Sequence, residues 1–136
     1  MIRRCISTLR DGERGQALVE MALVLPLFLV LVLGIVDFGR AYQQHITVSG
    51  AAREGARLGV TGAPASEIIA RAAAAAGDLP VTVEVSNACG TAGTALVVSV
   101  EHAYSAITPL GLFVTAFSDS IPLRASADMR LEHTGC

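Results

Sequence analysis

The sequence contains no lysine, and only 16% of its 136 residues are charged, whereas roughly a quarter are charged in an ordinary soluble domain. The formal net charge is −2, and no arginine cluster lies beside interleaved aromatic side chains. Nucleic-acid recognition depends on such clusters, so we expect no nucleic-acid partner. The length admits one domain plus one membrane segment, which excludes a large multi-domain enzyme and a multi-span transporter or channel monomer.

The shortage of charge is concentrated in one apolar run. Residues 21–36 read MALVLPLFLVLVLGIV and contain no charged side chain. Extending the run back to Ala17 gives about 30 Å of helix, which is enough to cross a bilayer. We therefore predict a transmembrane helix over residues 16–37, surrounded by membrane lipid. Pro26 should bend or loosen it locally, because proline removes one helical hydrogen bond.

The charges on the two sides of this run differ in sign. Residues 1–15 carry four arginines and two acids, whereas residues 16–136 carry six arginines and ten acids. The positive-inside rule then keeps the N-terminus cytoplasmic and places residues 38–136 outside the membrane. The run is followed by Asp37-Phe38-Gly39-Arg40, without a small-x-small cleavage pattern, so we expect the helix to remain attached as an anchor.

Glu20 is an unusual residue for the cytoplasmic end of such a helix. An ionised carboxylate costs about 2.5–3.5 kcal/mol at the centre of a bilayer, and less near the interface. In one interpretation the span begins at Met21 and Glu20 reaches the lipid headgroups. In the other, Glu20 lies inside the span for a functional reason, because residues 17–19 already continue the apolar helical pattern before it.

Residues 14–20, Arg-Gly-Gln-Ala-Leu-Val-Glu, resemble the prepilin processing site of the type IV filament systems. That family has a short basic leader ending in glycine, a cut after the glycine and a glutamate as the fifth residue of the mature chain. The resemblance implies a leader over residues 1–15, with Gly15 as its last residue and Gln16 as the new N-terminus. It also implies that Glu20 pairs with the terminal amine of a neighbouring subunit and fixes the axial register between subunits.

The longer stretch 15–60 begins GQALVEMALVLPLFLVLVLGIVDFGRAY and ends with AAREGARLG, and it closely resembles the TadE-like pseudopilins of the tight-adherence (Tad/Flp) pilus systems. The last predicted strand, ending ADMRLE at residues 127–132, is similar too, whereas Met21 stands where an aromatic residue is typical. The resemblance implies a minor pseudopilin of the bacterial cytoplasmic membrane that acts in assembling or priming a Tad/Flp pilus. The implied partners are a prepilin peptidase, the inner-membrane Tad assembly platform with its ATPase, a sister pseudopilin and the major pilin.

A second interpretation stays open at this point. The chain could be an uncleaved, signal-anchored envelope protein whose exported domain is a binding module. Gly15 and Glu20 discriminate between the two, because a plain anchor needs neither residue.

The helical pattern continues over residues 38–60 without a proline. Small residues are frequent between Gly50 and Gly59, and glycines destabilise an exposed helix by roughly 1 kcal/mol each, so this face should be closely packed. Its partner could be the chain's own sheet or the helix of a second subunit; we favour the chain's own sheet, since most such faces pack within one chain. Arg53, Glu54 and Arg57 should form a solvated edge, with a Glu54–Arg57 pair.

The remaining residues predict a second helix and a small sheet. Residues 61–64 break the first helix, Ser66 is positioned to cap the second, and Gly77 should end it. Period-two alternation then predicts strands over residues 81–86, 95–103 and 121–132. The last strand places on one face Leu123, Ala125, Ala127, Met129 and Leu131. The expected fold class is α+β, with one long N-terminal helix, transmembrane and then amphipathic, packed on a small antiparallel sheet as in pseudopilins.

Two of the three cysteines, Cys89 and Cys136, lie in the part that we expect to be exported. An oxidising compartment would let them pair, and a small sheet would benefit from a covalent link. The bridge would close a loop of about 47 residues and add up to roughly 4 kcal/mol by the chain-entropy estimate. The alternative is two free thiols.

An apolar stretch at residues 107–117 separates the second and third predicted strands. Its large side chains could cover the sheet edge as core, or form an exposed patch that contacts another subunit or the membrane surface. We favour the core interpretation. The residues concerned are Leu110, Phe113, Val114 and Phe117.

No catalytic, metal or cofactor site is predicted. His45, His102 and His133 are far apart in sequence, and no two of them have metal-ligand spacing. His102 should instead be a hydrogen-bonded residue of the sheet. The glycines at residues 90–93 lack the lysine and helix of a phosphate-binding loop, and no serine lies in a nucleophile elbow, so we expect a structural protein rather than an enzyme.

Overall fold

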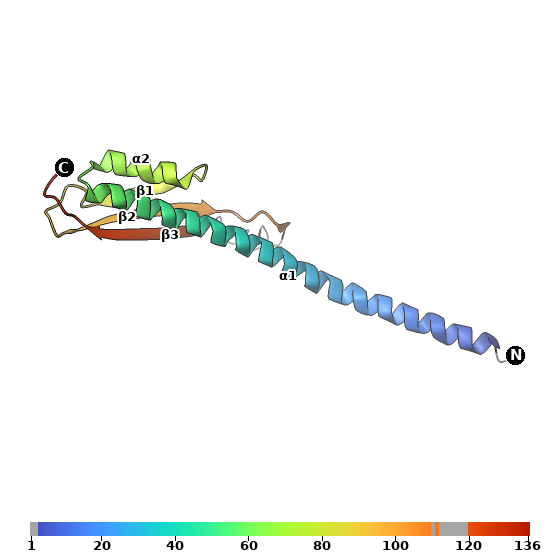
Figure 1. The fold of residues 1–136 in the computed structure, drawn as a ribbon. Helices are drawn as coiled ribbons and strands as arrows, with labels where there is room; N and C mark the ends of the chain where they lie inside the picture. The colour runs from blue at the N-terminus through green and yellow to red at the C-terminus, as the bar shows by residue number, and fades with distance from the viewer. Residues whose placement is uncertain (1–2, 110, 112–119) are drawn as a thin grey trace.

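The protein is described from a computed structural model, which describes residues 3–109, 111 and 120–136, with side chains from residue 15 onward. Its elements are two helices and three strands: α1 Arg3–Val60, α2 Ala65–Ala76, β1 Thr82–Ser86, β2 Ala95–Tyr104 and β3 Ile121–Arg130. In Figure 1 the first part of α1 extends alone, while its C-terminal part lies beside the other elements. The expected α+β fold, a long apolar helix with a small antiparallel sheet, is confirmed.

α1 is one continuous helix of 58 residues, which passes through Pro26 without interruption. Leucine, a strong helix former, is the most frequent residue between Ala17 and Leu33. The helix ends at a glycine turn, where Gly62 has a φ of 86° and donates its N–H to the carbonyl of Gly59 at 3.1 Å. A left-handed residue just past the last turn is the usual way to satisfy the final carbonyls of a helix.

α2 corrects one prediction. Its N-cap is Pro64, whose carbonyl accepts the N–H of Ile68 at 3.2 Å, and no side chain caps the helix, so the expected Ser66 cap is wrong. The extended backbone of Pro64 begins the helix early enough to place Ser66 inside the first turn. The predicted end is confirmed, because Gly77 has a φ of 65° and donates its N–H to the carbonyl of Ala74 at 3.2 Å.

The three strands form one antiparallel sheet in the order β1-β2-β3. In the register of the central strand, Val98 lies opposite Val85 on one side and Ala127 on the other. The predicted strands are confirmed, with ends that differ by one or two residues. The predicted inward face of the last strand is confirmed as well, because its residues are buried or half-buried while their neighbours are exposed.

α1 and α2 cover the same face of the sheet and enclose the core with it. The side chains that are completely buried there include Val48, Ala51, Ala52, Ala56, Ile68, Ala72, Leu96 and Val98. The other face of the sheet is open and polar. It carries an ion pair in which Arg124 Nε lies 3.0 Å from Glu101 Oε2.

The small residues of α1 let it approach the sheet and α2 closely. A Cβ on Gly59 would lie 2.2 Å from Leu96 Cδ2 and 2.9 Å from Ile68 Cδ1, and a Cβ on Gly55 would lie 3.0 Å from Ala72 Cβ. Side chains at these two positions are therefore excluded by neighbours of the same chain. This confirms the chain's own sheet as the partner of the small-residue face, and it adds α2, which the sequence did not indicate.

The predicted charged edge of α1 is confirmed and extended. Arg57 Nη2 lies 3.1 Å from Glu54 Oε1, and Arg71 of α2 donates through Nε to the same oxygen at 3.0 Å. Hydrogen bonds from Arg71 and then Arg57 hold the pKa of the Glu54 carboxyl below its ordinary value. The pair between Glu54 and Arg71 ties α2 to α1 on the solvent side.

The apolar stretch expected to be core lies mostly outside the described residues. The four large side chains on which that prediction depends, Leu110, Phe113, Val114 and Phe117, are all outside them.

Candidate functional site

The predicted processing residues lie on the part of α1 that extends beyond the sheet (Figure 1). Gly15 and Gln16 are exposed, and the space around a Cβ on Gly15 is empty to 4 Å. The peptide bond between them is open to solvent but is held in a helix. Glycine lowers the stability of a helix by about 1 kcal/mol relative to alanine, which makes this turn easier to unwind.

Glu20 lies four residues beyond Gln16, on the same face of α1. Its carboxylate is exposed, as are the apolar side chains of Val19 and Met21 on either side of it. None of the ion pairs among the described side chains includes Glu20. The charge is therefore available to a group outside this chain, and in hydrocarbon it would need one.

The apolar run of α1 is mostly exposed in the described part of the structure, with only Leu33 and Gly34 half-buried. Residues 15–32 are all exposed, and Leu23 and Phe28 keep 74% and 58% of their surface accessible. Within the described part of the chain, α1 is the one helix long and apolar enough to cross a membrane, and its most apolar window is completely unburied. A soluble protein rarely leaves such a surface in water, whereas a bilayer accommodates it.

Where the apolar run ends, Asp37 fastens the end of β2 to α1. Its backbone carbonyl accepts the hydroxyl of Tyr104 at 3.0 Å. Its carboxylate accepts the backbone N–H of Ile107 at 3.3 Å and that of Thr108 at 3.2 Å, and it also accepts the Thr108 hydroxyl. The Asp37 carboxylate, which directly follows the apolar run, thus accepts all three of these hydrogen bonds from one short segment of chain.

Sequence reasoning missed this cluster. The acidic residue directly after the apolar run was visible, but its partners lie about 70 residues away in sequence. Burial raises the pKa of the Tyr104 hydroxyl, and the negative charge of Asp37 raises it further, so Tyr104 remains a neutral donor. Tyr104, at the end of the central strand, was the one signal available in the sequence, because a buried tyrosine hydroxyl needs a hydrogen-bond acceptor nearby.

His102 is a buried, hydrogen-bonded residue of β2, as predicted. Its Nδ1 lies 2.8 Å from the carbonyl oxygen of Pro80, and its Nε2 lies 3.2 Å from Oε1 of Gln44 on α1. In the part of the chain that the structure describes, no group of three or more histidine, cysteine, aspartate or glutamate residues is placed to hold a metal ion.

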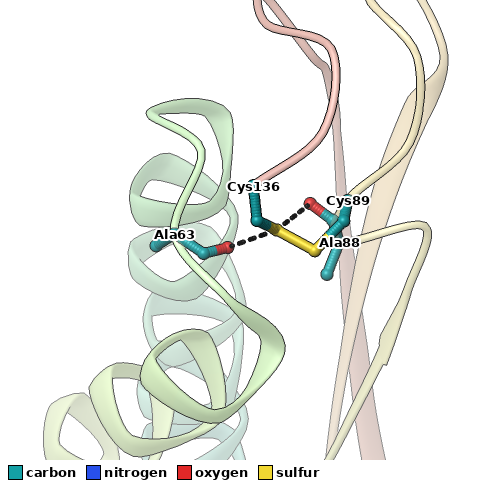
Figure 2. The surroundings of a disulfide bond; sticks show 4 residues. All are labelled: Ala63, Ala88, Cys89 and Cys136. Carbon is teal, nitrogen blue, oxygen red and sulfur yellow. Dashed lines mark hydrogen bonds between the residues drawn. A yellow bond between two sulfur atoms is a disulfide. The ribbon is translucent and has the colours of Figure 1, made fainter.

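Cys89 and Cys136 are joined by a disulfide, with their Cα atoms 4.9 Å apart (Figure 2). The sulfur of Cys136 also lies 3.7 Å from the carbonyl oxygen of Ala63 and 3.6 Å from that of Ala88. These are close contacts, because a disulfide sulfur has no proton to donate. The link ties the turn after β1 to the segment after β3, beside the start of α2.

Backbone hydrogen bonds hold the same two segments together. Gly93 donates to the carbonyl of Leu131 at 2.8 Å, Leu131 donates to that of Thr94 at 2.9 Å, and Gly135 donates to that of Gly90 at 3.0 Å. The disulfide therefore joins segments that are already paired.

The predicted residues form two separate groups. Gly15, Gln16 and Glu20 lie within six residues of α1, on its uncovered part, whereas the two cysteines lie at the far end of the folded domain. Figure 1 shows this separation, with the C-terminus at the end of the molecule opposite the N-terminus. The first group belongs to an exposed helix rather than to a cleft, which suits recognition by other proteins.

In the comparison with protein families, residues 15–57 match the family described as TadE-like protein. The resemblance read from the sequence is thereby confirmed for this stretch. The match begins at Gly15 and includes Glu20, the apolar run, Asp37 and the small-residue face of α1 except Gly59. Comparisons with curated proteins and with solved structures found no match.

Proposed function

We propose, from the TadE-like character of residues 15–57, that this chain is a minor pseudopilin that acts in assembling or priming a Tad/Flp-type pilus. The observation that carries the proposal is that the family match covers the exposed, apolar part of α1 from Gly15 onward, which includes the carboxylate of Glu20. The coarser conclusion, a pilus-related membrane protein, follows from the family and the candidate span together.

Processing is the first step of the proposal. A prepilin peptidase cuts between Gly15 and Gln16, after unwinding the helical turn that contains them. The cut removes residues 1–15, which carry two more arginines than acids, and it leaves a free amine on Gln16. The loss of this positive segment weakens the electrostatic retention of the N-terminus at the cytoplasmic face. The mature helix can then move outward more easily.

Glu20 supplies the second step. In the membrane its ionised carboxylate is costly, and pairing with an amine of opposite charge reduces that cost. The terminal amine of a neighbouring subunit is such a partner, and it exists only after cleavage. A subunit displaced along its neighbour would leave Glu20 unpaired. The pairing therefore sets the axial register, and the apolar surface around it supplies most of the contact area.

The partners follow from this arrangement. The exposed apolar part of α1 contacts membrane lipid first, and then the helices of a sister pseudopilin and the major pilin. The inner-membrane Tad assembly platform engages the chain during this transfer. The folded domain lies outside the membrane, where an oxidising environment maintains the Cys89–Cys136 disulfide.

The test is a piliation assay in cells that lack the chromosomal copy, complemented with Glu20→Leu. We expect this variant to insert into the membrane, as judged by its resistance to alkaline extraction, and to yield no pili. The matched control is Glu67→Leu, which removes the charge of an exposed glutamate on α2 and should leave piliation normal. Normal piliation with Glu20→Leu would contradict the register role and would favour the uncleaved anchor with an exported binding module.

A further inference from the structure

We infer that the end of the sheet next to Asp37 rests on the lipid headgroups of the membrane from which α1 emerges, so that the folded domain has a lipid-contacting surface. This inference rests on the proposed insertion of α1 in a membrane. The surface is made by the exposed apolar side chains at this end, which are Phe38, Tyr42, Ile107 and Ile121.

The level of this surface is set by Asp37. The apolar run ends at Val36, so Asp37 marks the point at which α1 leaves the hydrocarbon. Residues that form hydrogen bonds with Asp37 must lie at the same height relative to the bilayer. Tyr104 and Thr108 both do so, from a part of the chain about 70 residues away. No linker therefore separates the membrane from the folded domain.

The packing along α1 agrees with this placement. At the far end of β2, Leu96 fills the space beside Gly59, and at the near end Tyr104 reaches Asp37. The helix advances about 1.5 Å per residue and a strand about 3.4 Å, so the two contacts are about 33 Å apart along α1, and Leu96 and Tyr104 are about 27 Å apart along β2. β2 thus runs beside α1 down to the end of the apolar run.

The exposed apolar side chains of the folded domain gather at this end. Phe38 is 73% exposed and stacks on Tyr42, with ring centroids 6.4 Å apart. Ile107, which is 54% exposed, bonds to Asp37 through its backbone, and Ile121 lies opposite Tyr104 in the sheet. Beyond the apolar run, the only other large apolar side chains exposed in the described part of the chain are Ile46 and Ile69.

Lipid is the occupant that this arrangement favours. The surface continues the lipid-exposed side chains of the span without a gap, since Ile35 is 63% exposed and Phe38 follows it by one helical turn. Aromatic side chains are typical of the membrane–water boundary. Asp37 is tolerated there because three donors satisfy its carboxylate. The exposed arginine Arg40 lies one turn further out, where its guanidinium reaches phosphate groups.

The absence of tryptophan from the chain makes the test direct. Three isoleucines are replaced singly by tryptophan in the full chain: Ile35→Trp in the span, Ile107→Trp at the proposed surface and Ile69→Trp on α2. Each variant is reconstituted in phosphatidylcholine vesicles, with or without acyl chains brominated near the headgroup, and tryptophan emission is compared. Ile121→Trp is a second reporter at the proposed surface, from a different strand.

We expect bromination to quench Ile35→Trp, Ile107→Trp and Ile121→Trp, and to leave Ile69→Trp unchanged. Quenching at position 35 together with unquenched emission at positions 107 and 121 would overturn the lipid-contacting surface while leaving membrane insertion intact. That result would assign the apolar end to a protein partner. Unquenched emission at position 35 would show that α1 does not enter the bilayer, and would overturn both the inference and the membrane insertion on which it rests.

Discussion

Replacing Gly59 by alanine should separate close packing from helix propensity. In an unpacked helix this change stabilises by about 1 kcal/mol, because alanine is the better helix former. Here the new Cβ would lie 2.2 Å from Leu96 Cδ2 and 2.9 Å from Ile68 Cδ1, and both of those side chains are completely buried. Neither has solvent to move into, so the methyl group must displace α1 from the sheet or force strained rotamers.

The size of the effect follows from two opposing contributions. Overpacking a well-filled core costs typically about 1–3 kcal/mol. After the gain of about 1 kcal/mol in helix propensity, a net destabilisation of up to roughly 2 kcal/mol remains for Gly59→Ala. Gly50→Ala is the matched control, since no atom lies within 4 Å of its added Cβ, and it should stabilise by up to about 1 kcal/mol.

The assay is urea unfolding of the full chain in mild detergent, followed by tyrosine fluorescence, because Tyr104 is buried in the folded domain. Gly59→Ala should lower the unfolding midpoint and Gly50→Ala should raise it slightly. Adding Leu96→Val to Gly59→Ala removes Leu96 Cδ2, the atom nearest to the new methyl group, so the double variant should be more stable than the sum of the single effects predicts. Equal midpoints for the two alanine variants would refute the close packing of α1 on the sheet.

Three further predictions concern the cysteines, the acids and their partners. Cys89→Ser should lower the free energy of unfolding by up to about 4 kcal/mol. In wild-type exported protein a thiol reagent should label neither Cys89 nor Cys136 before reduction, and labelling of both would disprove the pairing. The pKa of Glu54 is lowered in the folded state, so its contribution to stability is present above the ordinary glutamate pKa of about 4.3 and is lost as the pH falls through the lowered value. Arg71→Gln should therefore weaken the dependence of the free energy of unfolding on pH at acid pH, and an unchanged dependence would contradict this. Asp37→Asn should lower the unfolding midpoint in the same urea assay, since two backbone donors lose a charged acceptor, and an unaltered midpoint would contradict the fastening role.

The sequence was sufficient for the elements whose residues repeat with a clear period. The apolar run, the alternation of the last strand and the glycine at residue 77 each act locally, so their consequences could be predicted without knowing the rest of the chain. The Ser66 cap failed for a local reason as well. Proline at position 64 is already extended and can begin a helix, and this outweighed the capping preference of a serine two residues later.

The contacts between distant segments were beyond sequence reasoning. The fastening of Tyr104 and Thr108 to Asp37, and the pairing of Arg71 with Glu54, depend on how β2 and α2 lie against α1. A single sequence contains no information on which of many polar residues will meet. The same limit applied to the small-residue face of α1, whose pattern indicated close packing but not α2 as a partner.

The account depends most on processing after Gly15, and one measurement tests this directly. The intact mass of the membrane-bound protein is determined with and without a co-expressed Tad prepilin peptidase, for the wild type and for Gly15→Leu. The account predicts a wild-type product that lacks residues 1–15 only when the peptidase is present, and no such product from Gly15→Leu. A wild-type chain that remains full-length beside a peptidase active on its major pilin would contradict the account.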